Sequence, residues 1–399
     1  MNIKLDRFLN YTFLSLDILI LMLYHHFPMI GVGRHIPYYL SIVCLGVNVY
    51  YSKRIFNTPY IYWFLWVVFA ILNTYFKGGQ LEQSGTQLSV FCQIFSNFVL
   101  LYVVSLEFQR NRIYLLKFII VCLLIYAFGS FFSVTSILGG RELAFDGNTT
   151  ILMIMFLPMF GMLLFQYKRL SMPMLLLYIV VALYFIVVGA TRKAIGGLAI
   201  VGFLFVLSRV DFRSFKAIMF VIIAFVVVYF AFDYMMENTV LGERLEEGVD
   251  RDDLFVPYEL RDHWFFSFVG DRGRYYFLGW KCFINNFWTG LGLKNYMMYD
   301  PEGHTLHTEY MVQFAECGLI GFTLYVLFMG WMAYNLLYIF FKIEKRETLI
   351  YAGIYGAILF ISFTAWTYQF PIYFIVFGVI IGYCKDKRLI KKLYANRNL

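Results

Sequence analysis

Charged residues are scarce in this chain of 399 residues, at 15%, against about a quarter in soluble domains. Hydrophobic residues make up 61% of the chain and aromatic residues 21%. No single soluble core buries such an excess, because most residues of a globule lie at or near its surface. The composition therefore excludes a soluble enzyme, a disordered chain and a secreted disulfide scaffold. It predicts a polytopic membrane protein.

Cysteine pairs and phosphate-binding loops are also missing. Of the six cysteines, only Cys282 lies in a long polar segment, so no disulfide framework is predicted. The sequence contains no P-loop, no zinc-protease helix motif and no nucleophile elbow, which leaves ATP-driven chemistry without support. It also lacks internal repeats, low-complexity segments and a soluble domain of ordinary size.

Apolar runs long enough to cross a bilayer recur along the chain. A transmembrane helix needs about 20 mostly apolar residues, with a range of about 17–25. The candidate spans lie at about 8–29, 36–51, 60–76, 88–107, 113–137, 151–167, 174–190, 193–209, 217–233, 309–341, 349–366 and 369–384. We therefore expect an all-α, polytopic membrane helix bundle of about 12 transmembrane helices, with residues 1–399 forming one integral membrane domain. No small-residue cleavage site follows the first run, so it is expected to be a retained helix.

The net charge of +8 is best explained by topology and not by a nucleic-acid partner. Lys and Arg concentrate in every second loop, and such loops face the cytoplasm under the positive-inside rule. With the N-terminus inside, the cytoplasmic segments carry Lys4, Arg7, Lys53, Arg54, Arg110, Arg112, Lys168, Arg169, Arg209, Arg213, Lys216, Lys342, Lys345, Arg346 and the basic tail from Lys385. Both termini are therefore expected to be cytoplasmic.

One outside loop is much longer than the others. Residues 234–308 connect the ninth and tenth expected spans, beginning with an acidic stretch at 243–253 and continuing into aromatic, Gly-rich sequence. A long connection usually has a purpose of its own. Residues 274–291 are predicted to form an interfacial helix that ends at the Gly290/Gly292 pair. This loop is the first place to look for a functional site.

Cations near the outer boundary form the first candidate group. Arg192 and Lys193 lie between two closely spaced spans, and Arg141 lies in a neighbouring outside loop. An Arg near hydrocarbon is costly without a partner, and its guanidinium can hold phosphate oxygens through two nitrogens. Several such residues suit a lipid diphosphate headgroup. Each could instead reach ordinary lipid phosphates, or pair with Glu142 or Asp146.

Two histidines form the second candidate group. His304 and His307 lie where the long loop enters the tenth span, and a helix there would place them on one face. Histidine can take a proton from a hydroxyl near neutral pH. The nearby Glu302 and Glu309 make a metal site conceivable, but no third His or Cys has ligand spacing. A histidine that only forms hydrogen bonds at the interface is the plainer alternative.

An Asp-x-Asp pattern at Asp250 and Asp252 is a weaker candidate. Some sugar-nucleotide enzymes hold a metal with this pattern, but here it lies in an acidic loop and fits a solvated run of charge. His25 and His26, near the outer end of the first span, are expected to be structural. We expect neither a metal nor a cofactor.

Four segments, in order along the chain, resemble the O-antigen ligase and O-antigen (Wzy-type) polymerase superfamily. Residues 307–321 carry HTEYM and ECGLIG, similar to the family's His-Asn-x-aromatic-Leu followed by an acidic residue and Gly-x-x-Gly. Residues 274–292 resemble its Arg, Trp and Asn-Pro-x-x-Gly-x-Gly stretch. Residues 191–194 resemble its Ser-Arg-x-Ala, and residues 141–148 its Arg and Gly-Asn segment. The chain departs from the pattern at Thr308, Met311 and Trp288, where Asn, Leu and Pro are usual.

The resemblance implies a metal-independent, inverting glycosyl transfer at the outer face of the bacterial cytoplasmic (inner) membrane. The donor would be a glycan on undecaprenyl diphosphate. His307 would be the catalytic base, and Arg192, Arg274 and Arg141 would hold the diphosphate. His304, Tyr310 and Glu309 would support the site or contact the acceptor.

Three functions remain open within this interpretation. The first is a polymerase that joins repeat units of O-antigen or capsule, with a chain-length regulator protein as an additional partner. The second is a ligase that moves the finished glycan from the same carrier to a lipid A core. The third is a non-enzymatic flippase for the lipid-linked sugar, although transporters usually have two similar halves with polar residues near the midplane.

Overall fold

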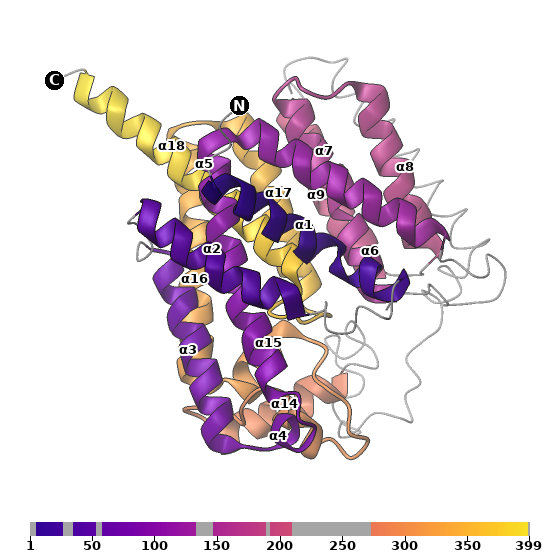
Figure 1. Ribbon diagram of the computed structural model, residues 1–399, viewed down its shortest axis with the longest axis vertical. Coiled ribbons are helices and arrows are strands. Elements are labelled where there is room, and N and C mark those ends of the chain that lie inside the picture. Colours follow the sequence, from indigo (N-terminus) through magenta and orange to yellow (C-terminus); the bar gives the residue numbers. More distant parts are fainter. Residues whose placement is uncertain are drawn as a thin grey trace.

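The computed structural model describes residues 5–26, 35–52, 58–132, 147–188, 192–209 and 273–397. Every regular element in these ranges is a helix (Figure 1). The first group comprises α1 (Leu5–His26), α2 (Ile36–Ser52), α3 (Tyr60–Lys77), α4 (Gln80–Gln83), α5 (Gln87–Phe132), α6 (Gly147–Ile154), α7 (Phe156–Gln166), α8 (Met172–Val188) and α9 (Arg192–Arg209). The second comprises α14 (Gly273–Asn285), the 3₁₀ turn η4 (Asn295–Met298), α15 (Glu309–Met311), the π-helical turn η5 (Val312–Glu316), α16 (Gly318–Lys342), α17 (Lys345–Ser362) and α18 (Pro371–Arg397).

The expected apolar runs within these ranges all overlap helices; the run at 217–233 lies outside them. Two runs, 88–107 and 113–137, correspond to one element, α5, which is broken at Asn111 by a non-helical backbone (φ −159°, ψ 83°). The tenth run, 309–341, does not form one uniform helix. It begins with α15 and the π-helical turn, and its regular α-helix starts only at Gly318.

Among the described helices, two are long and apolar enough to cross a membrane, namely Gln87–Phe131 and Gly318–Lys342. Ile36–Tyr51, Thr150–Gln166 and Met172–Val187 are apolar but shorter. Large apolar side chains also point outward from α2, α8 and α16, with Ile42 61%, Val180 62% and Leu337 58% exposed. Such surfaces are unfavourable in water and suit a lipid environment.

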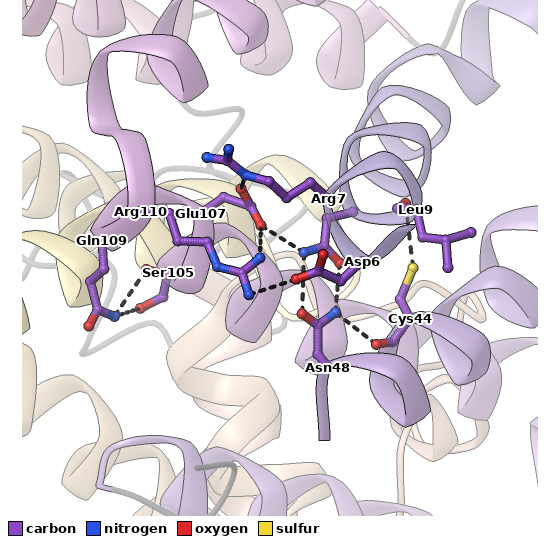
Figure 2. Close-up of polar contacts among 10 residues, drawn as sticks. Asp6, Arg7, Leu9, Cys44, Asn48, Ser105, Glu107, Gln109 and Arg110 are labelled. Atoms are coloured by element: carbon purple, nitrogen blue, oxygen red, sulfur yellow. Dashed lines mark hydrogen bonds and ion pairs between the residues drawn. The ribbon is translucent and has the colours of Figure 1, made fainter. Parts of the chain in front are cut away.

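A buried polar cluster fastens α1 and α2 to the break in α5 (Figure 2). The Glu107 carboxylate, 1% exposed, accepts hydrogen bonds from Asn10 at 2.8 Å and from Arg110 at 2.7 Å. Arg110 also pairs with Asp6 at 2.8 Å, and Asn48 donates to Asn10 at 2.6 Å. Because buried charges are stable only when paired and hydrogen-bonded, the cluster fixes where α5 changes direction.

A second set of contacts joins the ends of α7, α17 and α18 to the same break. Arg112 pairs with Asp386 at 3.5 Å and lies 4.6 Å from the centre of the Tyr167 ring. Glu347 accepts the Tyr167 hydroxyl and pairs with Lys387 at 2.6 Å. The loops at Arg110/Arg112, the end of α7 and the start of α17 thus converge with the basic tail. In Figure 1 this end lies opposite α4 and α14.

Candidate functional site

The helix that carries Arg274 is shorter than the sequence predicts. It spans Gly273–Asn285 and not 274–291, and the chain then turns through Gly290 and Gly292, both at positive φ (68° and 88°). The two glycines therefore shape the turn that follows α14 and do not directly terminate the helix. This turn runs against the start of α16.

The backbones of Gly290 and Gly318 pack directly against each other and join the Gly-x-Gly segment to the Gly-x-x-Gly segment. Gly318 also has a positive φ, 63°, and a Cβ on it would lie 2.4 Å from the Gly290 nitrogen. A Cβ on Gly290 would lie 2.5 Å from the Gly318 nitrogen. Backbone bonds from Leu291 to Ala315 (2.9 Å) and from Leu319 to Phe287 (2.8 Å) complete the join. The Gly-x-Gly and Gly-x-x-Gly segments therefore form one close backbone contact.

The π-helical turn separates two buried carboxylates that hold different loops. Glu309, just before the turn, accepts from the backbone N–H groups of Thr367 (2.5 Å) and Tyr368 (3.2 Å). Glu316, at its end, accepts from the backbone N–H groups of Lys294 and Tyr296. Burial leaves neither carboxylate facing solvent. The Glu309 carboxylate therefore holds the turn at 367–368.

Arg274 lies at the centre of a cluster of charged groups. Its side chain is buried, with one guanidinium nitrogen 2.5 Å from the Glu302 carboxylate and the other 2.7 Å from Nδ1 of His304. The second nitrogen also donates to the Tyr275 hydroxyl at 3.3 Å and lies 4.0 Å from Asp300. Hydrogen bonds to Tyr275 and Glu302 outweigh burial and raise the pKa of Arg274, so it is a permanent cation.

The two carboxylates beside Arg274 differ in exposure. The Asp300 side chain is 0% exposed and accepts from the backbone N–H of His304 (3.1 Å) and, through its other oxygen, from that of Glu302 (3.3 Å). Asp300 thus shapes the loop. The Glu302 side chain is 39% exposed, so its ion pair with Arg274 faces solvent. The hydrogen bond from Arg274 lowers the pKa of Glu302.

His307 lies at the surface between two aromatic rings. Its ring centre is 5.5 Å from that of Tyr275 and 5.6 Å from that of Trp366. The Arg274 guanidinium lies 5.0 Å from the centre of the same Tyr275 ring. The predicted base and the arginine predicted to bind the diphosphate therefore share one aromatic neighbour. The expected helical face with His304 does not form, because residues 303–308 are not helical and the helix begins at Glu309.

Thr308 and Tyr310 face the helix bundle. The Thr308 hydroxyl donates to that of Tyr276 at 3.1 Å, which in turn donates to the Phe363 carbonyl at 2.7 Å. The Tyr310 hydroxyl donates to the Leu359 carbonyl at 2.9 Å, so Tyr310 holds α15 against α17. Beside these residues lies an almost wholly apolar pocket of about 470 Å³. Its lining includes Tyr276, Trp280, Tyr310, Phe314, Phe322 and Met329.

Other predicted residues are placed only in part. Arg192 is the first residue of α9, and its side chain is not described. Arg141 and the Asp250/Asp252 pair lie outside the described residues. Within the described ranges, no group of three or more His, Cys, Asp or Glu has an arrangement that could hold a metal ion.

Residues that the sequence analysis missed complete the site. Lys294, at φ 62°, places its ammonium 5.9 Å from the centre of the Trp366 ring, the second ring that His307 touches. Trp366 comes from the turn between α17 and α18, which carries no charged residue to attract notice. Burial raises the pKa of Cys282 to about 11, so its thiol is a packing group and not a nucleophile at neutral pH.

Comparison of the chain with models of known protein families gives no match. Comparison with curated proteins gives none either.

Proposed function

We propose that this chain is a polysaccharide polymerase of the bacterial inner membrane that joins undecaprenyl-diphosphate-linked repeat units at the outer face. In this proposal about 12 helices cross the membrane and both termini are cytoplasmic. The observation that carries it is the packing of Arg274 and His307 against the same Tyr275 ring. A permanent cation and a base that share one aromatic neighbour are the two groups that transfer from a diphosphate carrier requires.

The proposed reaction is a single inverting displacement. His307 takes the proton from an acceptor sugar hydroxyl while that oxygen attacks the anomeric carbon of the donor. The new glycosidic bond forms as the bond between the anomeric carbon and the diphosphate oxygen breaks. Arg274, together with Lys294 beside the Trp366 ring that His307 also contacts, stabilises the charge that the departing diphosphate gains. These cations supply what a divalent metal supplies in many glycosyltransferases, so we expect activity to survive EDTA.

The apolar pocket beside the site suits the carrier's hydrocarbon chain. Its lining is almost free of polar surface, and it lies between α14 and the apolar helices α16 and α17. Tyr276 and Tyr310 line this pocket, and the Tyr276 hydroxyl accepts from the hydroxyl of Thr308, the residue that follows the base. An isoprenoid chain in this pocket would bring its diphosphate toward Arg274 from the membrane side.

The deciding experiment is lipid and glycan profiling of a deletion strain. Loss of a polymerase leaves single-repeat products, whereas loss of a ligase strands full-length glycan on the carrier. The ligase shares the donor and the same His and Arg, so it is the principal alternative outcome. Transfer by the purified protein in detergent, without a bilayer, would exclude a pure flippase. If the purified protein transfers no glycan in detergent while the deletion strain fails to export the lipid-linked sugar, the protein is not an enzyme of this kind.

A further inference from the structure

We propose that Glu309 is a positioning residue for His307, acting through the turn that carries Trp366; this inference rests on the proposed function. A continuous line of buried hydrogen bonds supports it. Trp66 Nε1 donates to Gln313 Oε1 at 2.7 Å, and Gln313 Nε2 donates to Glu309 Oε1 at 2.8 Å. The other Glu309 oxygen accepts from the backbone of Thr367 and Tyr368.

The direction of each bond in this line is forced by chemistry. An indole N–H can only donate, so the Gln313 oxygen must face Trp66 and the Gln313 NH₂ must face Glu309. Backbone N–H groups can also only donate. Glu309 therefore has donors facing both of its oxygens, and a carboxylate group accepts from all of them. All three side chains are fully buried, so no water is needed in the arrangement.

The line holds the chain segment that carries Trp366. Glu309 accepts from Thr367 and Tyr368 through its side chain, and its own N–H donates to the Ala365 carbonyl at 3.2 Å. These bonds bracket Trp366 on both sides. On the far side, Asn97 donates to the Tyr368 carbonyl at 3.0 Å, which ties the same turn to α5.

Glu309 lies two residues after His307, so it fixes the Trp366 backbone directly to that of the base. The His307 ring rests between Trp366 and Tyr275. Without the carboxylate, the Trp366 turn keeps only the backbone bond from Glu309 to Ala365 among these three bonds. The Trp366 ring, one of the two that flank His307, is then held less firmly. Misplacement of a catalytic group by about 1 Å can cost about 100-fold in rate. We therefore expect loss of Glu309 to lower kcat more than it raises KM.

The test is a reversal of the hydrogen-bond polarity. In Glu309→Gln, the new NH₂ must face either the Gln313 NH₂ or the two backbone N–H groups. In both orientations, two hydrogen-bond donors face each other with no acceptor between them. In the double variant Glu309→Gln/Gln313→Glu, the amide oxygen accepts from Thr367 and Tyr368. The amide NH₂ then donates to the new carboxylate, which also accepts from Trp66. The double variant keeps the buried charge and volume unchanged, so it controls for both.

Two readouts are needed, and the first does not depend on glycan transfer. The rate of diethylpyrocarbonate modification at His307, followed by peptide mass spectrometry, should change at least threefold in Glu309→Gln and return to the wild-type rate in the double variant. The second readout is kcat, which should fall about 10- to 100-fold and recover in the double variant with little change in KM.

The outcomes separate this inference from the proposed function. Unchanged His307 modification and kcat in Glu309→Gln would overturn the positioning role while leaving the enzyme intact. The wild-type protein could instead transfer no glycan while His307 modification changes in Glu309→Gln and recovers in the double variant. That result would contradict the proposed function and support the positioning role. If Glu309→Gln fails to fold, the double variant decides: folded protein with normal His307 reactivity supports the line of bonds, and its failure overturns it.

Discussion

The Nδ1 atom of His304 lies 2.7 Å from a guanidinium nitrogen of Arg274. The same atom lies 3.1 Å from the Glu302 carboxylate, so His304 belongs to the charged cluster around Arg274. His307 lies between the Tyr275 and Trp366 rings instead. The two histidines therefore have different surroundings: His304 contacts the arginine, and His307, the base that the family resemblance implies, contacts two aromatic rings.

Replacing His307 with Ala should abolish transfer while leaving expression and folding intact. Loss of a general base typically costs about 100- to 10,000-fold, and the His307 side chain is exposed, so its removal leaves no cavity. His304→Ala is the matched control, because it should raise the KM for the donor more than it lowers kcat. Initial rates with purified protein in detergent would measure both. Near-normal product from His307→Ala would place the base elsewhere.

Replacing Arg274 with Lys should also abolish transfer, although the positive charge is kept. Two guanidinium nitrogens serve different partners, one Glu302 and the other His304 and Tyr275. A single ammonium cannot reproduce this fork. Lys281→Arg is a control on the same helix, since Lys281 is exposed and lies over the Phe277 ring. Measurable transfer by Arg274→Lys at a rate within twofold of wild type would rule out a forked diphosphate contact.

Replacing Glu302 with Gln should strengthen binding of an anion at Arg274. Inorganic pyrophosphate is a suitable probe, and calorimetry at pH 7 should show roughly two- to fivefold tighter binding, which is the range of exposed ion pairs. The pKa of Glu302 is lowered by Arg274, so its ion pair is complete above the ordinary carboxyl value and is lost as pH falls through the lowered pKa. The two proteins should therefore converge in affinity only in that acidic range. Equal affinities at pH 7 would show that Glu302 does not compete.

The helices were predictable from the sequence because their signal is local. The expected apolar runs overlap helices throughout the described ranges, and the break in α5 lies in the gap expected between two runs. The runs 151–167 and 309–341 depart from the expectation, because each is divided into more than one element. The break at Asn111 follows from charged residues that lie near it in sequence. The π-helical turn does not, because it exists to bring Gln313 and Glu316 onto partners more than 200 and about 20 residues away.

The candidate site was predictable only for residues that lie within a recognisable sequence motif. His307 and Arg274 belong to segments with a recognisable pattern, and the structure brings them to one ring. Trp366 and Lys294 reach the site through tertiary contacts of turns whose sequences carry no motif. The helical pairing of His304 with His307 failed because Asp300 binds the loop backbone and holds this segment extended up to Thr308.

Replacing Gly318 with Ala should destabilise the protein without altering the chemistry of the site directly. The residue has a positive φ of 63°, where a Cβ costs about 1–2 kcal/mol. The added carbon would also lie 2.4 Å from the Gly290 nitrogen and 2.6 Å from the Thr289 carbonyl carbon, both of them backbone atoms that cannot rotate away. The apparent Tm in detergent should therefore fall by several degrees. Gly202→Ala is the control, because a Cβ at that helical position meets no atom within 4 Å and Ala favours the helix by about 1 kcal/mol over Gly. If Gly318→Ala melts no lower than Gly202→Ala, the two glycine motifs do not lock together as described.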